Sequence, residues 1–194
     1  MFSSQKLKNV ILEIYNDSRT VFRLNDIALL VSESNFQSLN RKLNYYVRTG
    51  KLLNPRKGIY AKQGFNSEEL ACILFTPCYL SLEYVLLKNG IIFQYDQRMT
   101  LVSYLSRTVQ IGNQVFIYRK LQDKTLVNID GINRQNNQIN TASPERAFLD
   151  ILYLNGDYYF DNLNPINKQM VFKLLPIYNS KVLVDRAKKI LKNG

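Results

Sequence analysis

Histidine and tryptophan are absent from the 194 residues of this chain. Without histidine there can be no Ser-His-Asp or Cys-His catalysis and no histidine metal ligand, and the commonest general base is missing. Two cysteines occur, Cys72 and Cys78, and both lie in an apolar stretch. Two are too few for a structural zinc site and are more typical of buried thiols than of a disulfide. The cysteine usage therefore favours a reducing compartment.

Long apolar runs are also lacking. The longest one without a charge covers residues 70–82, which is 13 residues interrupted by Pro77, whereas a bilayer span needs about 20. Residues 1–6 do not lead into the apolar region of a signal peptide. We therefore expect a cytoplasmic protein that does not interact with a membrane. The eight glycines form neither a GxGxxG motif nor a phosphate loop, so we expect no cofactor, no metal and no enzymatic activity.

Acidic residues are scarce in a chain that otherwise has an ordinary globular composition, 46% hydrophobic and 21% charged. The 26 Lys and Arg residues against 15 Asp and Glu give a net charge of +11. The first 66 residues contain 11 of the basic residues and 4 of the acidic ones. This excess favours a polyanionic partner, with nucleic acid as the first candidate.

Hydrophobic periodicity predicts three short helices near the N-terminus. The first covers residues 4–16, the second is capped by Asn25, and the third opens at Ser34 and ends at Gly50. Two apolar runs around an Asn-Pro turn then predict a β-hairpin over residues 51–62. Three helices followed by a hairpin are the order of a winged helix-turn-helix, whose second motif helix lies in the DNA major groove.

We therefore predict a winged helix-turn-helix DNA-binding domain at residues 1–64. From residue 37 to residue 62 there are seven Lys and Arg residues and no Asp or Glu. Arg suits guanine, Gln and Asn suit adenine, and Tyr, Ser and Lys suit phosphates. The alternative is a merely solvated helix face. The residues predicted to bind DNA are Gln37, Ser38, Arg41, Lys42, Asn44, Tyr45, Arg48, Lys51, Arg56 and Lys57.

Residues 65–194 alternate between helical and strand-like stretches, which predicts an α+β protein whose second domain is mixed α/β with a small antiparallel sheet. Ser143 followed by Pro144 is typical of a helix start. The expected helices are 68–75, 81–88, 144–154, 165–178 and 181–192. The expected strands are 91–93, 101–104, 108–111 and 115–118, the last two joined by Gly112-Asn113 as a hairpin.

Carboxylates in this second part do not assemble into an obvious active site. On a helix, Glu145 and Asp150 would lie about 140° apart, so an ion pair with Arg146 between them is the favoured interpretation. A metal-dependent nuclease using these two residues and Asp157 is the enzymatic alternative. The chain closes on a basic tract over residues 181–192. Either complementation of a helix dipole or a functional surface would explain that tract.

Three stretches together resemble a known family. They are Lys57-Gly58-Ile59-Tyr60 in the second wing strand, residues 79–84 followed by Asn89-Gly90, and Thr141-Ala-Ser-Pro-Glu-Arg-Ala-Phe-Leu-Asp150. This order is similar to that of the AbiEi-type antitoxins of bacterial abortive-infection systems. The residues that match the family motif are Ser81, Pro144, Glu145, Arg146 and Asp150, and we interpret them as structural.

The resemblance implies an N-terminal domain that binds double-stranded DNA and represses its own operon at an operator with inverted repeats. It also implies a C-terminal domain that counters a co-encoded nucleotidyltransferase toxin of a type IV system without forming a stable complex with it. We therefore expect a DNA-binding autorepressor and antitoxin. The alternative is a stand-alone winged-helix repressor whose second domain binds a ligand or dimerises.

Overall fold

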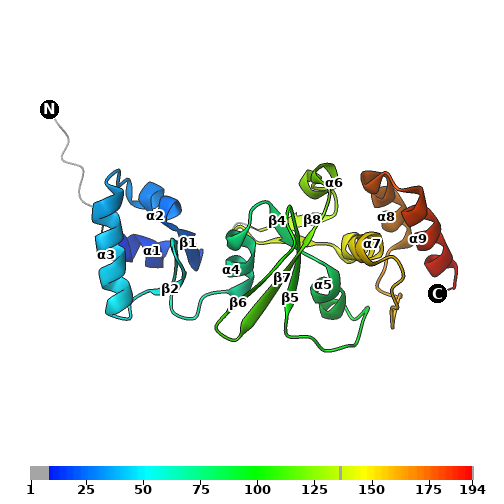
Figure 1. The fold of residues 1–194 in the computed structure, drawn as a ribbon, viewed down its shortest axis with the longest axis horizontal. Coiled ribbons are helices and arrows are strands. Elements are labelled where there is room, and N and C mark those ends of the chain that lie inside the picture. Colours follow the sequence, from blue (N-terminus) through cyan, green and yellow to red (C-terminus); the bar gives the residue numbers. More distant parts are fainter. Residues whose placement is uncertain (1–8, 136, 194) are drawn as a thin grey trace. The chain divides into compact units, whose positions relative to one another are not determined.

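The computed structural model describes residues 9–135 and 137–193 and is a mixed α+β fold (Figure 1). It divides into two compact units, one ending at Ile73 and the other beginning at Leu74. The expected domain boundary lay nine residues earlier, between residues 64 and 65. No helix in the described part of the chain is both long enough and apolar enough to cross a bilayer.

The N-terminal unit contains four helices and a three-stranded antiparallel sheet among its described residues. The sheet order is β1-β3-β2, so the predicted hairpin is confirmed and gains β1 as a third strand. Its core is formed by side chains such as Ile14, Phe22, Ile27, Leu39 and Leu43. The elements are α1 (Val10–Asn16), β1 (Val21–Arg23), α2 (Leu24–Val31), α3 (Phe36–Arg48), β2 (Leu53–Arg56), β3 (Ile59–Ala61) and α4 (Ser67–Leu74).

The helix starts differ from those predicted. Within the described chain α1 begins at Val10, and residues 4–8 of the predicted helix lie outside the described residues. Helix α2 is not capped by Asn25, because the carboxylate of Asp26 accepts the Arg23 N–H at 2.9 Å and the helix starts two residues earlier, with Arg23 at the N-cap. Helix α3 is capped by Asn35 rather than Ser34, through a 2.9 Å hydrogen bond from the Ser38 N–H. Short polar side chains cap helices equally well at adjacent positions, so sequence spacing alone predicted the wrong capping residues.

Helix α4 belongs to the N-terminal unit because a buried carboxylate ties it to β1. The Glu69 carboxylate accepts hydrogen bonds from the N–H and hydroxyl groups of Thr20, at 2.6 and 2.8 Å, and from the Val21 N–H at 3.0 Å. Arg23 donates from Nη2 to the Ile73 carbonyl at the end of the helix, at 2.6 Å. These bonds explain why the compact unit extends past the predicted boundary.

The C-terminal unit is built on a six-stranded sheet with the order β6-β7-β5-β4-β9-β8. Its elements are β4 (Cys78–Leu80), α5 (Leu82–Lys88), β5 (Met99–Ser103), β6 (Arg107–Ile111), β7 (Gln114–Lys120), α6 (Asp123–Val127), β8 (Ile132–Arg134), β9 (Asn140–Ala142), α7 (Pro144–Asn155), α8 (Lys168–Leu174), the 3-10 helix η1 (Leu175–Tyr178) and α9 (Lys181–Asn193).

The predicted antiparallel sheet is wrong, because this sheet is mixed: β5 runs parallel to β7, and β4 runs parallel to β9. The predicted hairpin at Gly112-Asn113 is confirmed, but its second strand, β7, pairs with β5 and leaves β6 at the edge. Residues 91–93 are not a strand, since the Ile91 carbonyl accepts the N–H groups of Asp161 and Asn162. Strand β4 and helix α6 were not predicted.

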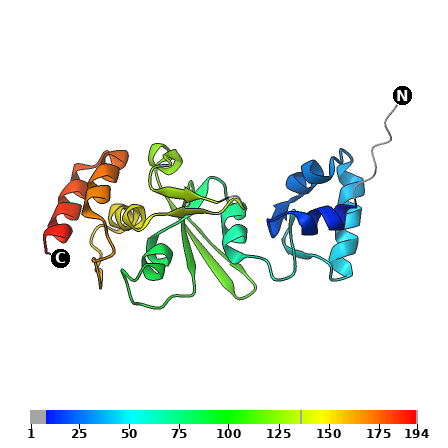
Figure 2. The ribbon, with the colours of Figure 1, turned by 180° about the vertical axis from the view of Figure 1, so that it is seen from behind.

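Helices surround this sheet in layers that Figures 1 and 2 show from opposite sides. Helix α5 packs against β5 and α7, and α7 in turn packs against α8 and α9. Ser143 caps α7 through a hydrogen bond from the Arg146 N–H, with Pro144 in the first turn, as predicted. The central position of α7 brings its side chains within reach of most of the unit.

Candidate functional site

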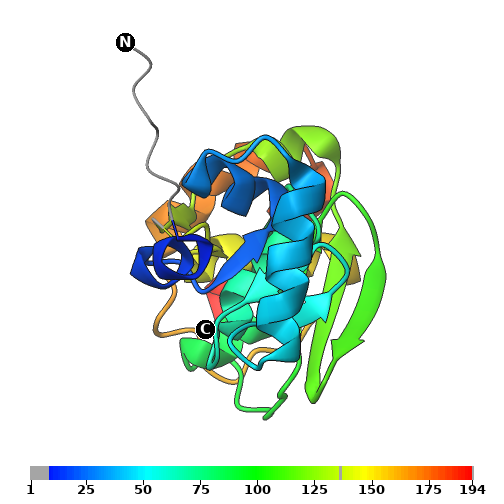
Figure 3. The same ribbon diagram turned by 90° about the vertical axis from the view of Figure 1, so that its left-hand side faces the viewer.

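Helix α3 is amphipathic, and its polar side faces solvent. Leu39 and Leu43 are fully buried in the core, and Tyr46 and Val47 pack against it. Phe36, the first residue of α3, is apolar but 47% exposed. Figure 3 shows α3 lying along one side of the N-terminal unit with its outward side uncovered by other elements of that unit.

Five predicted DNA-contacting residues of α3 are exposed together. At 3.6 residues per turn, four of them fall within an arc of about 60°, and the fifth lies about 70° from the centre of that arc. They are Gln37, Arg41, Asn44 and Arg48, and then Tyr45, which is 50% exposed. The first and last of these side chains are separated by about 16 Å along the helix axis. The structure therefore brings the predicted base- and phosphate-binding groups to one continuous surface, which we call the α3 face.

Two other predicted residues on α3 are less available. Lys42 is half-buried, and its Nζ lies 3.6 Å from Oε2 of Glu33, so a carboxylate partly neutralises it. Ser38 is half-buried at the start of the helix, where its N–H is bound by Asn35. By contrast, no carboxylate in residues 9–135 or 137–193 forms an ion pair with Arg41 or Arg48.

The hairpin is fastened to the same helix. The Tyr60 hydroxyl on β3 donates to Oδ1 of Asn40 on α3 at 2.7 Å, and burial raises the pKa of Tyr60. At the hairpin turn Arg56 and Lys57 are exposed, and Gly58 has a φ of 79°, which glycine adopts without strain. Lys51 is exposed before β2, and its carbonyl accepts the Tyr15 hydroxyl at 2.8 Å. The cations of the hairpin are therefore held on a framework continuous with α3.

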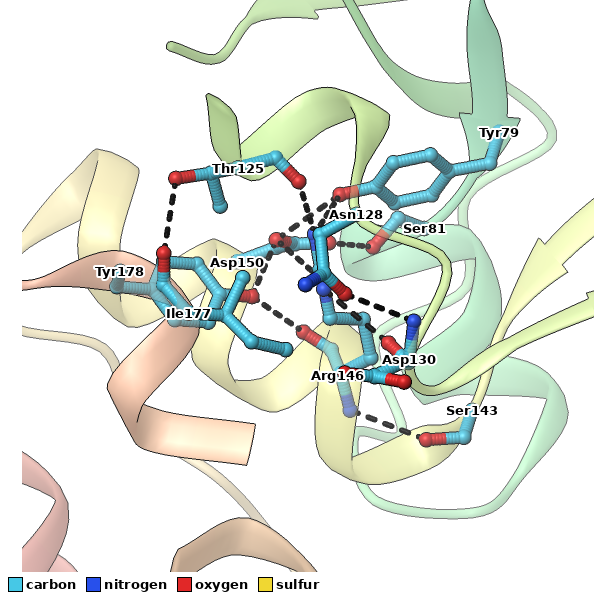
Figure 4. Close-up of polar contacts among 10 residues, drawn as sticks. All are labelled: Tyr79, Ser81, Thr125, Asn128, Asp130, Ser143, Arg146, Asp150, Ile177 and Tyr178. Atoms are coloured by element: carbon cyan, nitrogen blue, oxygen red, sulfur yellow. Dashed lines mark hydrogen bonds and ion pairs between the residues drawn. The ribbon is translucent and has the colours of Figure 1, made fainter. Parts of the chain in front are cut away.

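Three of the five residues of the family motif, Ser81, Arg146 and Asp150, gather instead in a buried cluster within the C-terminal unit (Figure 4). Arg146 and Asp150, one turn apart on α7, have no exposed side-chain surface, and Nε lies 3.5 Å from Oδ1. Asp150 accepts hydrogen bonds from the hydroxyls of Ser81 at 2.7 Å, Tyr178 at 2.6 Å and Tyr79 at 3.2 Å. The predicted ion pair of Arg146 is confirmed, with Asp150 rather than Glu145 as its partner.

Arg146 reaches backbone groups on the other side of the cluster. It donates from Nη2 to the Thr125 carbonyl at 2.7 Å and to the Tyr79 hydroxyl at 3.2 Å, and from Nη1 to the Asp130 carbonyl at 3.2 Å. Through these bonds α7 holds β4, α6, the segment before β8 and η1. Burial raises the pKa of Asp150, against the opposing effects of Arg146 and of the hydroxyl donors.

The cluster is a scaffold and has no access for a substrate. Glu145, the next motif residue, binds the N–H of Asn167 at 3.1 Å and so holds the start of α8. Asp157 is exposed elsewhere. In the part of the chain that the structure describes, no three His, Cys, Asp or Glu side chains are placed to hold a metal ion, so the nuclease arrangement of Glu145, Asp150 and Asp157 does not form. Cys72 and Cys78 are buried and do not form a disulfide, as predicted.

Sequence reasoning missed three members of the cluster, Tyr79, Thr125 and Tyr178. A signal for Tyr79 existed, since it precedes Ser81 by two residues and alternate strand residues point to one face. Thr125 contributes a backbone carbonyl, and Tyr178 lies 28 residues beyond Asp150 on η1. No local pattern links these two positions to α7.

The basic tract at the C-terminus forms the outer side of α9. Lys181, Lys188, Lys189 and Lys192 are exposed, whereas Arg186 packs over Gly156 and donates to the Leu152 carbonyl at 3.3 Å. Cations stabilise a helix C-terminus, which fits Lys192 in the last turn, but Lys181 lies in the first turn of α9, where the dipole disfavours a cation. The helix dipole therefore explains some of the cations in this tract but not all of them.

No family model matches the sequence, and no curated protein matches it. Among solved structures, the chain is similar to the crystal structure of the RV2827C protein from Mycobacterium tuberculosis. The two share 13% sequence identity with a TM-score of 0.54, over 94% of this chain and 75% of that one. At this identity the similarity concerns the fold.

Proposed function

We propose that the N-terminal unit is a winged helix-turn-helix that binds double-stranded DNA. Helix α3 is the recognition helix, which enters the major groove, and the β2-β3 hairpin is the wing, which contacts the backbone or the adjacent minor groove. The order of α2, α3 and the hairpin, and the fastening of the hairpin to α3 through Tyr60, support this assignment.

The α3 face carries the proposal, because it presents cations to solvent without accompanying carboxylates. Three acids of this unit are occupied elsewhere: Asp17 binds Arg19 at 2.7 Å, Asp26 caps α2, and Glu69 holds β1. Glu33 pairs with Lys42, which is not part of the α3 face. Phosphate binding gains from uncompensated Lys and Arg, since each contact releases condensed counterions. If the α3 face served only for solubility, exposed carboxylates could accompany its arginines. The separation of these cations from carboxylates instead favours an anionic partner.

The expected target is the DNA upstream of the gene that encodes this chain. Binding there makes the protein an autorepressor, and two copies on an inverted repeat would place their recognition helices about 34–36 Å apart. On α3, Arg41 reads a base edge, and at the wing Lys57 binds a phosphate. This role needs no enzymatic activity and no cofactor.

For the C-terminal unit we propose the antitoxin role, in which it counters a co-encoded nucleotidyltransferase toxin without a stable complex. The support is the resemblance in sequence, since three of its motif residues gather in one cluster that organises the unit. The alternative is a stand-alone repressor with a ligand-binding C-terminal unit. A nucleotidyltransferase gene beside this one, and restored growth when both are co-expressed, would support the antitoxin. A toxin that stays toxic on co-expression would contradict it.

Gel-shift titration of the full chain tests the DNA proposal, with the upstream DNA compared against an unrelated duplex of equal length. Arg41→Ala should weaken binding to the upstream DNA by ~1–3 kcal/mol and relax preference at one base position. Lys57→Ala should weaken both duplexes alike and reduce the salt slope by about one. Gln63→Ala, an exposed polar residue outside the predicted set, is the control. Equal, sequence-independent losses from both variants would refute the assigned roles.

A further inference from the structure

The C-terminal unit contains a hollow of about 500 Å³ that the DNA proposal does not use. Sites for small molecules in proteins measure roughly 300–1,000 Å³ and contain a few well-placed polar groups. This hollow is lined by Glu83, Ile92, Gln94, Tyr95, Asp96, Arg98, Thr100, Ile117, Arg119 and Tyr158. Its walls come from α5, the segment between α5 and β5, the strands β5 and β7, and the segment after α7.

Strand register places part of this lining on one face of the sheet. Thr100 of β5 pairs with Ile117 of β7, and Val102 pairs with Arg119, so these four side chains share a face. Thr100, Ile117 and Arg119 of this face line the floor formed by β5 and β7, as we call this part of the hollow.

The start of α5 is fixed over that floor. Thr100 donates from Oγ1 to the Ser81 carbonyl at 2.8 Å and accepts the Tyr84 N–H at 3.0 Å. Leu82, the first residue of α5, has a φ of 58°, which side-chain-bearing residues rarely adopt, so tertiary contacts must hold it there. Glu83 follows directly and is therefore held at the hollow.

Two charged groups in the lining are fully satisfied by each other. Asp96 accepts from Nε of Arg98 at 2.9 Å and from Nη2 at 2.7 Å. The remaining two charges behave differently. Within residues 9–135 and 137–193, the Glu83 carboxylate forms neither a hydrogen bond nor an ion pair, and Arg119 donates to the neutral Asn155 amide at 2.9 Å and pairs with no carboxylate.

Glu83 and Arg119 thus line the same hollow without an ion pair to each other, while the charge of Glu83 also acts on the Arg98 guanidinium. Burial, together with the charges of Glu83 and Asp161, raises the pKa of the Tyr158 hydroxyl beside them. Transferring a charge away from water is unfavourable unless a counter-charge meets it. A ligand that fills the hollow should therefore provide both a cation and an anion.

We propose that this hollow binds a small zwitterion of the amino-acid class, with its ammonium group at Glu83 and its carboxylate at Arg119. A neutral or singly charged ligand would leave one of these protein charges desolvated and unpaired. The rings of Tyr95 and Tyr158 provide an apolar wall for the rest of the ligand. This binding site is independent of the DNA proposal, since none of its residues belongs to the N-terminal unit.

The test uses the full chain. Thermal-shift measurements with each standard amino acid select the best stabiliser, because a ligand that binds the folded state raises the melting temperature. Calorimetric titration then compares that amino acid with its amine-only analogue and its carboxylate-only analogue, and with adenosine and guanosine monophosphates. The amino acid should bind about tenfold or more tightly than either analogue, because each analogue lacks one charge-assisted contact.

Two variants assign the charges. Glu83→Gln should weaken amino-acid binding about tenfold or more and leave the carboxylate-only analogue unchanged, and Arg119→Gln should spare the amine-only analogue instead. Glu13→Gln, a half-buried glutamate of the N-terminal unit, and Arg134→Gln, an exposed arginine of β8, are the matched controls. Circular dichroism verifies that each variant folds. Absence of binding by any amino acid, equal binding of the analogues, preference for a nucleotide, or unchanged affinity in both variants would overturn the proposal.

Discussion

Replacing Arg146 by methionine should make the stability of the C-terminal unit depend steeply on pH. In the native chain Arg146 lies 3.5 Å from Asp150 and opposes the rise that burial causes in the pKa of that carboxyl. Methionine fills similar space and removes this opposing charge. The folded-state pKa of Asp150 should then rise further above the ordinary value of an aspartate carboxyl.

The sign follows from proton linkage. A carboxyl whose pKa is higher in the folded state binds more protons there than in the unfolded chain, so stability is greatest at low pH. As pH increases from about 4 towards the folded-state pKa, the free energy of unfolding should fall by up to about 1.4 kcal/mol per pH unit. Above that range the variant retains a buried, unpaired carboxylate, and breaking a buried pair costs about 3–5 kcal/mol.

Urea unfolding, followed by circular dichroism at several pH values, measures this effect. The double variant Arg146→Met with Asp150→Asn is the control, since it keeps the methionine and has no carboxyl to titrate. Its unfolding free energy should follow the pH dependence of the other groups in the chain alone. If the single variant follows the same pH curve as the double variant, Asp150 does not titrate against folding, and the assigned ion pair is wrong.

The remaining predictions concern the N-terminal unit. A fragment ending at Gly64 should be less stable than one ending at Leu74 by about 3 kcal/mol or more, because it lacks the buried carboxylate hydrogen bonds of α4; equal urea midpoints would contradict this. A hydrogen bond from Arg19 lowers the pKa of Asp17, so ionised Asp17 stabilises the folded state above pH 3.8. This stabilisation is lost as pH falls through the folded-state pKa of Asp17. Asp17→Asn should flatten the acid limb of the stability curve, and an unaltered limb would refute the prediction.

Local signals predicted a large part of the fold. The hairpin at Gly112-Asn113 and the cap of α7 at Ser143 were confirmed because each depends on residues adjacent in sequence. The parallel pairing of β5 with β7 was missed, since hydrophobic alternation does not specify which strand is the neighbour. Strand β4 was missed because its three residues are all buried and show no alternation.

For the candidate sites too, local signals predicted some residues, and contacts between distant segments determined the others. The exposed residues of α3 were predicted as a set because helical periodicity places them on one side without reference to the rest of the chain. The availability of Lys42 for DNA was overestimated. Glu33 precedes the acid-free tract of residues 37–62 in sequence, but in the fold its carboxylate approaches Lys42. The hollow beside Glu83 and Arg119 was missed entirely, since strand register and the start of α5 bring its residues together.

A sequence motif is specific when each of its side chains must meet several structural conditions at once. Arg146 satisfies two backbone carbonyls, a tyrosine hydroxyl and a buried carboxylate, and no other side chain provides planar donors in that arrangement. An exposed arginine such as Arg41 is not required by the packing of its unit, so the fold alone does not determine which residue stands there. The strongest motif of this chain therefore identifies its architecture, and function must be sought at residues that the motif leaves out, on α3 and around the hollow in the C-terminal unit.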